Sequence, residues 1–508
     1  MTRLIEPAAT AVTREELPDA VASQLARGLR LALVAGHEDR PTDDFRVVYV
    51  LLGAANERVE VVVRVPRDDA WLPTLAGLSY PAGRFERELR DLFGIVPRDH
   101  PQPYRLVRHA HWPTGYHPML ADADPRPVFD GAAGFPFVEV AGKGIYEIPV
   151  GPVHAGLIEP GHFRFSVVGE TIVRMYQRLW FVHRGVEKLF EGRPVADGIA
   201  LAERISGDTA VGHSLAYAMA VEDALGIVVP ERDRVVRALL LECERLYNHV
   251  NDLGAIVNDV GFGIINAHAG RLRERLLRHN ARLTGHRLLR GAIRLGGAWL
   301  LAEPDLDLLA SMAAEVAELA EISTGHSLVA DRLDRTAVLP SDQAAQLGVL
   351  GYVARASGLG IDARVHQPFV SLGDAFRVVQ RETGDVRARF EVRAEEFAVS
   401  AAVIADLAAR LASSVIPAQA EISTPPRAVR AIQTTATASA GLGVVEAWRG
   451  TLVHRVEVND DGTLARVKVV DPSFCTWPAL GVALADTIVP DFPLANKSFN
   501  CSYAGNDL

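Results

Sequence analysis

Hydrophobic positions in the first quarter of the chain follow two different periods. Over residues 15–33 and 84–93 the apolar side chains are spaced three and four apart, which is the period of a helix with one buried face. Residues 46–52 and 59–65 are instead rich in valine and end next to glycine or proline, as strands do. Together these patterns predict a small α/β domain over residues 10–125, in which two strands are flanked by helices.

The remainder of the chain has a mainly helical pattern. Residues 126–145 are rich in proline and glycine and are predicted to be a linker. Residues 163–168 and 171–179 alternate around Gly169, which predicts an antiparallel hairpin. Three-and-four spacing then predicts helices over residues 211–225, 231–257, 270–290, 306–322, 342–356 and 374–413. We therefore expect a second, larger domain over residues 146–508 and an α+β fold overall.

An irregular segment precedes the last strand pattern. Residues 413–443 combine several prolines with a run of threonine, alanine and serine, which predicts a loop or a tolerated insertion. Residues 444–470 alternate on both sides of Asp460-Asp461-Gly462, which predicts strands joined by a turn. Gly441-Leu442-Gly443 lacks the further glycines and the following helix of a phosphate-binding loop, so we predict a turn there as well.

Composition and charge exclude several classes of protein. With 508 residues and 49% hydrophobic side chains, the chain is long and apolar enough for more than one packed core. Its net charge of −10 is not balanced by basic blocks, so nucleic acid is not an expected partner. Three scattered cysteines form no disulfide framework, which indicates a reducing compartment. No secretory signal or membrane-spanning stretch is visible, because the most apolar segment, residues 397–411, contains Asp406 and Arg410.

Several motifs resemble one protein family. Residues 85–95, Phe-Glu-Arg-Glu-Leu-Arg-Asp-Leu-Phe-Gly-Ile, resemble the signature of the small α/β hydrophilic subunit of respiratory complex I. Gly151-Pro152-Val153-His154, residues 182–189 and residues 244–249 resemble the large subunit that complex I shares with membrane-bound [NiFe] hydrogenases. The chain thus resembles a fusion of these two subunits, an arrangement typical of the large subunits of hydrogenase-4 and formate hydrogenlyase.

The resemblance does not extend to the metal ligands of the hydrogenases. That family holds nickel and iron with four thiolates, from one Cys-Gly-x-Cys and one Asp-Pro-Cys-x-x-Cys motif. Here the four positions are Ser206, Thr209, Ser473 and Thr476, and Cys475 is out of register. Hydroxyl groups stay protonated near neutral pH and offer hard oxygen, so they cannot replace thiolates around a soft bimetallic centre. We expect no metal and no other cofactor bound by this chain, with electrons supplied by an iron–sulfur cluster in a partner subunit.

The resemblance to complex I implies that the vacated metal cavity holds a quinone headgroup. The residues expected at such a site are His154, His213 and Asp471 in catalysis, and Arg204, Ser206, Asp208, Thr209, Ser473 and Thr476 in binding. Histidine and carboxylate groups are suited to delivering protons to a quinone, because histidine titrates near neutral pH. For each single residue, and for the two hydroxyls at positions 206 and 209 in particular, a satisfied buried hydrogen bond is an equally good interpretation.

One difference leaves a second function open. Complex I has another histidine four residues after the first, whereas this chain has Ile158 there. The alternative is a structural coupling subunit that links an iron–sulfur subunit to an ion-translocating membrane module. Both functions imply the same partners, namely a small iron–sulfur subunit with antiporter-like and other membrane subunits, and a peripheral location on the cytoplasmic face of the inner membrane. The electron donor stays open, including NADH through another subunit of the complex.

Overall fold

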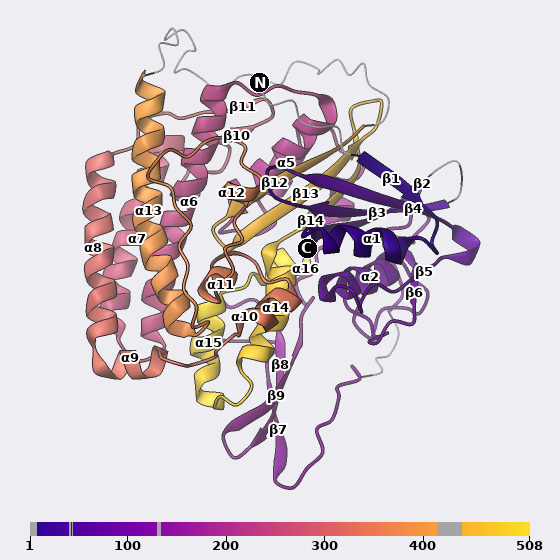
Figure 1. Cartoon of the computed structure of the whole chain (residues 1–508), viewed down its shortest axis with the longest axis horizontal. Helices are drawn as coiled ribbons and strands as arrows, with labels where there is room; N and C mark the ends of the chain where they lie inside the picture. Colours follow the sequence, from indigo (N-terminus) through magenta and orange to yellow (C-terminus); the bar gives the residue numbers. More distant parts are fainter. Residues whose placement is uncertain (1–7, 40–41, 43, 130–133, 414–438) are drawn as a thin grey trace.

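The computed structural model describes residues 8–39, 42, 44–129, 134–413 and 439–508. Figure 1 shows a small N-terminal α/β unit on one side, a bundle of long helices on the other, and mixed strands and short helices between them. A three-stranded sheet projects away from this body (Figure 1). The chain combines many helices with several small sheets in two regions, so the predicted α+β class is confirmed.

The N-terminal unit is built on a four-stranded sheet in the order β1-β4-β3-β2. Its elements are β1 (Ala8–Val12), α1 (Leu17–Ala26), β2 (Arg30–Asp39), β3 (Asp44–Leu52), β4 (Arg58–Pro66), η1 (Arg67–Asp69), β5 (Trp71–Pro73), α2 (Tyr80–Phe93) and β6 (Val96–Arg98). Strand β1 runs parallel to β4, and the other neighbours in this sheet are antiparallel. The two predicted strands are confirmed as β3 and β4.

The helix predicted over residues 15–33 is too long. It ends at Ala26, and the backbone at Gly28 has φ +88°, which a helix cannot contain. The next residues enter β2, where Leu31 and Leu33 are buried in the sheet. A continuous apolar run is compatible with both periods, so spacing alone does not separate the end of α1 from the start of this strand.

The projecting sheet contains the predicted hairpin. Strands β8 (His162–Val168) and β9 (Thr171–Arg178) pair antiparallel through a turn at Gly169, and β7 (Ile145–Val150) adds a third strand along β8. Strand β8 buries Phe163 and Phe165 against the body of the molecule. The hairpin prediction is therefore confirmed, with one strand more than expected.

The helical half is a bundle of α6, α7, α8 and α13 (Figure 1). The helices after the hairpin are α3 (Val186–Phe190), α4 (Gly198–Ala202), α5 (Ala210–Leu225), α6 (Glu231–Asn258), α7 (Gly263–Thr284), α8 (Leu306–Gly325), α9 (Ser327–Leu333), α10 (Ser341–Leu347), α11 (Gly351–Ala356), α12 (Ala363–His366) and α13 (Val386–Ser413), with the short strands β10 (Ile293–Arg294) and β11 (Gly297–Ala298). The helix predicted over residues 342–356 is split, because Gly348 and Gly351 have positive φ. The helix predicted over residues 374–413 begins only at Val386.

A second three-stranded sheet packs on α5. It consists of β12 (Ser439–Ala447), β13 (Gly450–Val458) and β14 (Leu464–Val470), and α14 (Pro472–Ala483), η2 (Val489–Asp491), α15 (Phe492–Phe499) and α16 (Tyr503–Asp507) follow it. The turn predicted at Gly441-Leu442-Gly443 is wrong, because these residues lie within β12. A Cβ atom on Gly443 would lie 1.9 Å from the Ala216 carbonyl oxygen, so glycine is needed for the strand to approach the helix backbone. Residues 414–438 of the predicted loop lie outside the described residues.

Buried ion pairs join the N-terminal unit to β14 and its neighbours. Lys468 Nζ lies 2.7 Å from Glu88 Oε1 on α2 and 3.0 Å from Glu187 Oε1 on α3. Arg466 Nη2 donates to the other oxygen of Glu187 at 2.6 Å, and all four side chains are buried. We call these four residues the charge seam. Within the described residues, no helix is long and apolar enough to cross a membrane.

Substitution of Lys468 tests the charge seam. Lys468→Met keeps the length of the side chain but leaves Glu88 without a counter-charge and weakens the pairing of Glu187. Breaking a buried pair in this way costs about 3–5 kcal/mol of the free energy of unfolding, which a denaturant titration measures. The matched control is Arg278→Ala in an exposed pair with Glu274 on α7, for which we expect a change within about 0.5 kcal/mol. Equal effects of the two substitutions would contradict a structural role for the seam.

Candidate functional site

The first motif lies in the loop between α4 and α5 and is organised around Asp208. Its two carboxylate oxygens accept from Arg449 at 2.7 and 2.6 Å. Asp208 Oδ1 also accepts from Ser206 Oγ at 2.9 Å and from Thr209 Oγ1 at 3.0 Å. Burial raises the pKa of Asp208, but the Arg449 charge and these hydrogen bonds outweigh it and hold the pKa at about 2. Asp208 is therefore an anion whose lone pairs are largely taken up within the loop.

The second motif begins α14 and is tied to the first by Ser502. Asp471 caps the helix by accepting from the Ser473 backbone N–H at 2.8 Å. Ser473 Oγ accepts from the Ser502 N–H at 2.8 Å, and Ser502 Oγ lies 2.9 Å from Ser206 Oγ. Two of the four positions that hold thiolates in hydrogenases are thus linked through one residue, by the backbone N–H and the hydroxyl of Ser502.

A row of three buried groups crosses the space between α5, β13 and α14. His213 is fully buried, with Nε2 3.2 Å from Asp471 Oδ2 and Nδ1 3.1 Å from His454 Nε2. Burial is the largest single effect and raises the pKa of Asp471, but the hydrogen bond and charge of His213, the charge of Arg449 and the hydrogen bond from Ser473 together outweigh it, so the pKa is lowered. Burial lowers the pKa of His454 well below its usual value. Strand, helix and C-terminal segment therefore bring a carboxylate and two imidazoles together, as a proton-handling site needs.

Two of the predicted residues lie apart from this group. His154 is in the loop after β7, and its Nε2 lies 2.8 Å from the Gly161 carbonyl oxygen. Its ring is 6.1 Å from that of Phe163, and it is not a hydrogen-bond partner of His213 or Asp471. The Arg204 side chain is 56% exposed and donates back to the Ala200 carbonyl oxygen in α4.

Three residues that the sequence did not single out complete the group. Arg449 pairs with Asp208, His454 extends the row from His213, and Ser502 bridges the two motifs. Arg449 and His454 lie next to or in β13, a valine-rich strand that also carries Arg455 and Glu457, and charged side chains that are buried require partners. That signal was available for these two, whereas nothing local distinguishes Ser502.

The donor set does not fit a [NiFe] centre. Ser206, Thr209 and Ser473 bond to neighbouring groups through their hydroxyls, and the Thr476 hydroxyl is buried without a hydrogen-bond partner among the described residues. Hydroxyl oxygen in place of thiolate is the wrong ligand for nickel and low-spin iron. In the described ranges, moreover, no three His, Cys, Asp or Glu side chains are grouped so that they could hold a metal ion.

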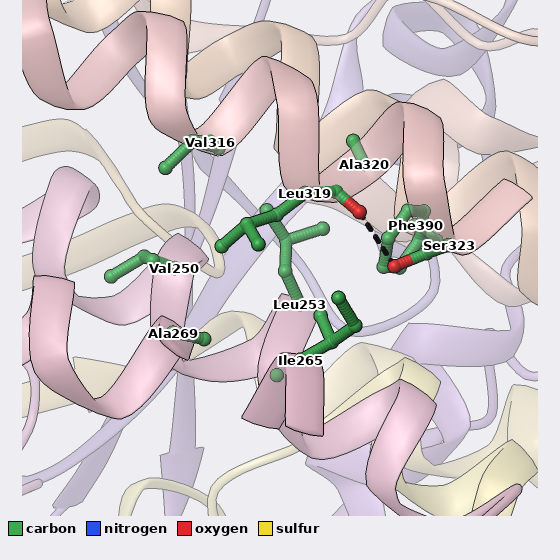
Figure 2. A pocket seen from close by; sticks show the side chains of 10 residues that line it. Val250, Leu253, Ile265, Ala269, Val316, Leu319, Ala320, Ser323 and Phe390 are labelled. Carbon is green, nitrogen blue, oxygen red and sulfur yellow. Dashed lines mark hydrogen bonds between the residues drawn. The ribbon is translucent and has the colours of Figure 1, made fainter. Parts of the chain in front are cut away.

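Two cavities in the described part of the chain lie away from the motif residues. One has a volume of about 10 Å³. Figure 2 shows apolar side chains that line it, among them Leu253 of α6, Ile265 of α7, Val316 and Leu319 of α8, and Phe390 of α13. The other, of about 30 Å³, lies between α2, residues 117–119 and 180–188, and the C-terminal Asp507 and Leu508. Around the motif residues themselves, direct hydrogen bonds join most of the polar groups.

Glu244, on α6, lies next to the first motif. Unlike Asp208, it has no ion-pair partner among the described residues. Its two oxygens accept from the backbone N–H groups of Val211 and Gly212, at 2.6 and 3.0 Å, at the start of α5. Burial is the largest effect and raises the pKa of Glu244 to about 8, although these two hydrogen bonds lower it. The first turn of α5, which carries His213, therefore rests on a group that titrates near neutral pH.

The pKa of Glu244 predicts a pH dependence of stability. A folded-state pKa near 8 lies above the value of about 4.3 for glutamate in an unfolded chain, so the folded state binds the proton more tightly. The free energy of unfolding should therefore fall as the pH rises from about 4.3 through 8. Glu244→Gln, which cannot titrate, should flatten this decline in denaturant titrations between pH 5 and 8.5. The control is Glu231→Gln, at the exposed start of α6, the helix that also carries Glu244. If the free energy of unfolding of Glu244→Gln falls with pH as steeply as that of the wild type, the raised pKa is not that of Glu244.

Family models match successive parts of the chain. The 30 Kd subunit of respiratory-chain NADH dehydrogenase matches residues 10–127, nickel-dependent hydrogenase matches residues 184–252, and the 49 Kd subunit of respiratory-chain NADH dehydrogenase matches residues 259–507. The order of these matches is that of a small hydrophilic subunit followed by a large one. It agrees with the motifs found at residues 85–95 and after residue 150.

Individual relatives match almost the full length. Hydrogenase-4 component G of Escherichia coli (strain K12) is 32% identical over 94% of this chain and 83% of its own length. Formate hydrogenlyase subunit 5 of the same organism is 32% identical over 94% of this chain and 84% of its own length. A chain in the structure of the membrane-bound sulfane sulfur reductase, an archaeal respiratory membrane complex, superposes with a TM-score of 0.64. The match covers 72% of this chain and 99% of that chain. Because the two sequences are only 24% identical, this likeness shows the fold alone.

Proposed function

The chain belongs to the family of hydrogenase-4 component G and formate hydrogenlyase subunit 5, with a 30 Kd-type region before a 49 Kd-type region, and we propose that it is the hydrophilic electron-accepting subunit of a membrane-associated respiratory complex. In this proposal an iron–sulfur cluster in a partner subunit passes electrons to a quinone-type acceptor beside the two motifs. NADH, where it is the donor, reacts at another subunit of the complex.

The observation that carries this proposal is the meeting of His213 with Asp471 beside hydroxyl groups of both motifs. Reduction of a quinone to a quinol takes up two electrons and two protons, and both carbonyl oxygens become hydroxyls. The electrons come from the partner cluster. A histidine hydrogen-bonded to a carboxylate can donate a proton to an acceptor. The Thr476 hydroxyl, which has no hydrogen-bond partner among the described residues, can donate to a carbonyl oxygen.

A second candidate function is supported by how fully the motif groups bind one another. Ser206, Ser473 and Ser502 form direct hydrogen bonds, and Arg449 is held by Asp208 and by the Asn500 carbonyl oxygen. A quinone would have to displace some of these contacts. In the alternative, the chain is a coupling subunit that joins an iron–sulfur subunit to an ion-translocating membrane module and turns over no acceptor of its own.

Substitutions at His213 and Asp471 separate the two functions. His213→Gln and Asp471→Asn remove proton transfer but keep side-chain size, so they should lower quinone-dependent electron transfer in the assembled complex by about 10²–10⁴-fold. His154→Ala tests the third predicted catalytic residue in the same assay. His268→Gln, at an exposed position on α7, is the control. If activity in every variant simply follows the amount of assembled complex, the coupling function is correct and the catalytic one is wrong.

The proposed attachment is peripheral and depends on protein partners. We expect the chain to be recovered with membranes of its native cell on the cytoplasmic face, and to be released by alkaline carbonate, which strips proteins held by protein contacts. Mild cross-linking before release should capture a small iron–sulfur subunit and antiporter-like membrane subunits. Recovery of the chain as a free monomer, with no companion after cross-linking, would contradict both proposed functions.

A further inference from the structure

The loop of the first motif is open to solvent on its outer side. Gly207 is exposed, and a Cβ atom added there would meet no heavy atom within 4 Å beyond its own chain neighbours. The side chain of Asp208 is 38% exposed, whereas Ser206 and Thr209 beside it are buried. With so little packing on the outer side, the conformation of this loop depends on the contacts of its inner side.

On the inner side, three side chains donate hydrogen bonds to one main-chain oxygen, the carbonyl oxygen of Asp208. Asn248 Nδ2 lies 2.8 Å from it, Trp448 Nε1 lies 3.0 Å from it, and the Tyr247 hydroxyl lies 3.2 Å from it. All three donor side chains are buried. A carbonyl oxygen has two lone pairs, so three donors saturate it and leave the peptide group little freedom to rotate.

Three residues of the motif at residues 244–249 act on this loop from one face of α6. Glu244, Tyr247 and Asn248 are spaced three and four apart, which places them on the same side of the helix. Glu244 accepts from the first N–H groups of α5, and the other two donate to Asp208. The Asn248 amide also donates to the Glu244 carbonyl oxygen at 3.0 Å, which fixes its orientation. The helix thus holds both the loop and the start of α5.

Trp448 adds a donor from a different element, the turn between β12 and β13. Its Nε1 lies 3.1 Å from Thr209 Oγ1 as well as 3.0 Å from the Asp208 carbonyl oxygen. Its ring is stacked on that of Tyr352, and the guanidinium carbon of Arg449 lies 4.0 Å from its centre. The carbonyl group of residue 208 and the hydroxyl of residue 209 therefore share one fixed donor, so neither can turn without affecting the other.

We propose that Tyr247, Asn248 and Trp448 are positioning residues, which set the orientation of the peptide between Asp208 and Thr209 and with it the direction of the Thr209 hydroxyl. None of the three is a member of the proton-handling row. The positioning does not depend on which of the two proposed functions is correct. Its consequence for the reaction rests on the proposed quinone function, in which a hydroxyl held in place beforehand binds the acceptor at a smaller cost in conformational freedom.

Amide hydrogen exchange at Thr209 tests the positioning in the full chain. The sequence contains two Asp-Thr pairs, at residues 208–209 and 486–487, so aspartate labelled with ¹³C at its carbonyl and threonine labelled with ¹⁵N give one NMR signal for each pair. Asn248→Leu removes the shortest of the three hydrogen bonds at nearly equal side-chain size, and Thr209 should then exchange about five- to tenfold faster. Thr487 should keep its rate, whereas a general loss of stability would act on both.

Two further variants complete this test. Tyr247→Phe removes one hydroxyl and keeps the ring, so it should speed up exchange at Thr209 less than Asn248→Leu does. Asn251→Leu, at an exposed position of α6, is the matched control and should change neither rate. Unchanged exchange at Thr209 in both Asn248→Leu and Tyr247→Phe would overturn the positioning; if Asn248→Leu does not fold, unchanged exchange in Tyr247→Phe does the same.

Kinetics of the assembled complex test the consequence for the reaction. Because the loop would bind the acceptor while His213 and Asp471 handle protons, Asn248→Leu should raise KM for a water-soluble quinone about five- to tenfold and lower kcat less. A fall in kcat with KM unchanged would overturn the role in acceptor binding. Faster exchange at Thr209, in a complex that reduces no quinone even with the wild-type chain, would uphold the positioning and refute the quinone function.

Discussion

The pairing of Glu187 with the two cations of β14 is the interaction on which the position of the second motif depends. Glu187 is buried and accepts from Arg466, from Lys468 and from the Val469 backbone N–H. The strand ends at Val470, one residue after Val469, and Asp471 follows directly. Because an unmatched buried charge is far more costly than a surface one, this strand cannot shift its register without breaking several pairs together. The distance between Asp471 and His213 is fixed in this way.

A second set of buried charges fixes the opposite side of the site. Arg355 lies 2.7 Å from Glu396 on α13 and 2.8 Å from Glu446 on β12, and Arg245 donates to the backbone carbonyl of Glu446. Glu446 lies three residues before Arg449, which is in the turn between β12 and β13. The Arg449 side chain thus reaches Asp208 from a turn whose start is held by ion pairs to the helical bundle. Both halves of the site are positioned by long-range electrostatics rather than by local turns.

This explains which parts of the molecule could be predicted from the sequence. Long amphipathic helices such as residues 231–257, and the hairpin around Gly169, follow from local periodicity and were found nearly at their observed bounds. The pairing of the two motifs was expected only by resemblance, and its bridge through Ser502 could not be foreseen, because a serine has no periodic signal. Gly441 and Gly443 have the composition of a turn, and their use in a strand becomes visible only when α5 lies against it.

The hydrogen bonds among the motif hydroxyls follow from the loss of the thiolates. Four thiolates in one buried space repel one another unless a metal neutralises them, whereas hydroxyls can donate and accept in turn. The hydroxyls of Ser206 and Ser502 bond to each other, and the Ser473 hydroxyl accepts from the Ser502 backbone N–H, so the two motifs can pack without a metal. An acceptor that enters must exchange these bonds, each worth about 1 kcal/mol net, for bonds to its own carbonyl oxygens. A molecule with two carbonyl groups can make that exchange nearly neutral, and a purely apolar one cannot. In the proposed quinone function, the same hydrogen-bond chemistry that lets the two motifs pack without a metal would therefore favour an acceptor with carbonyl groups over an apolar one.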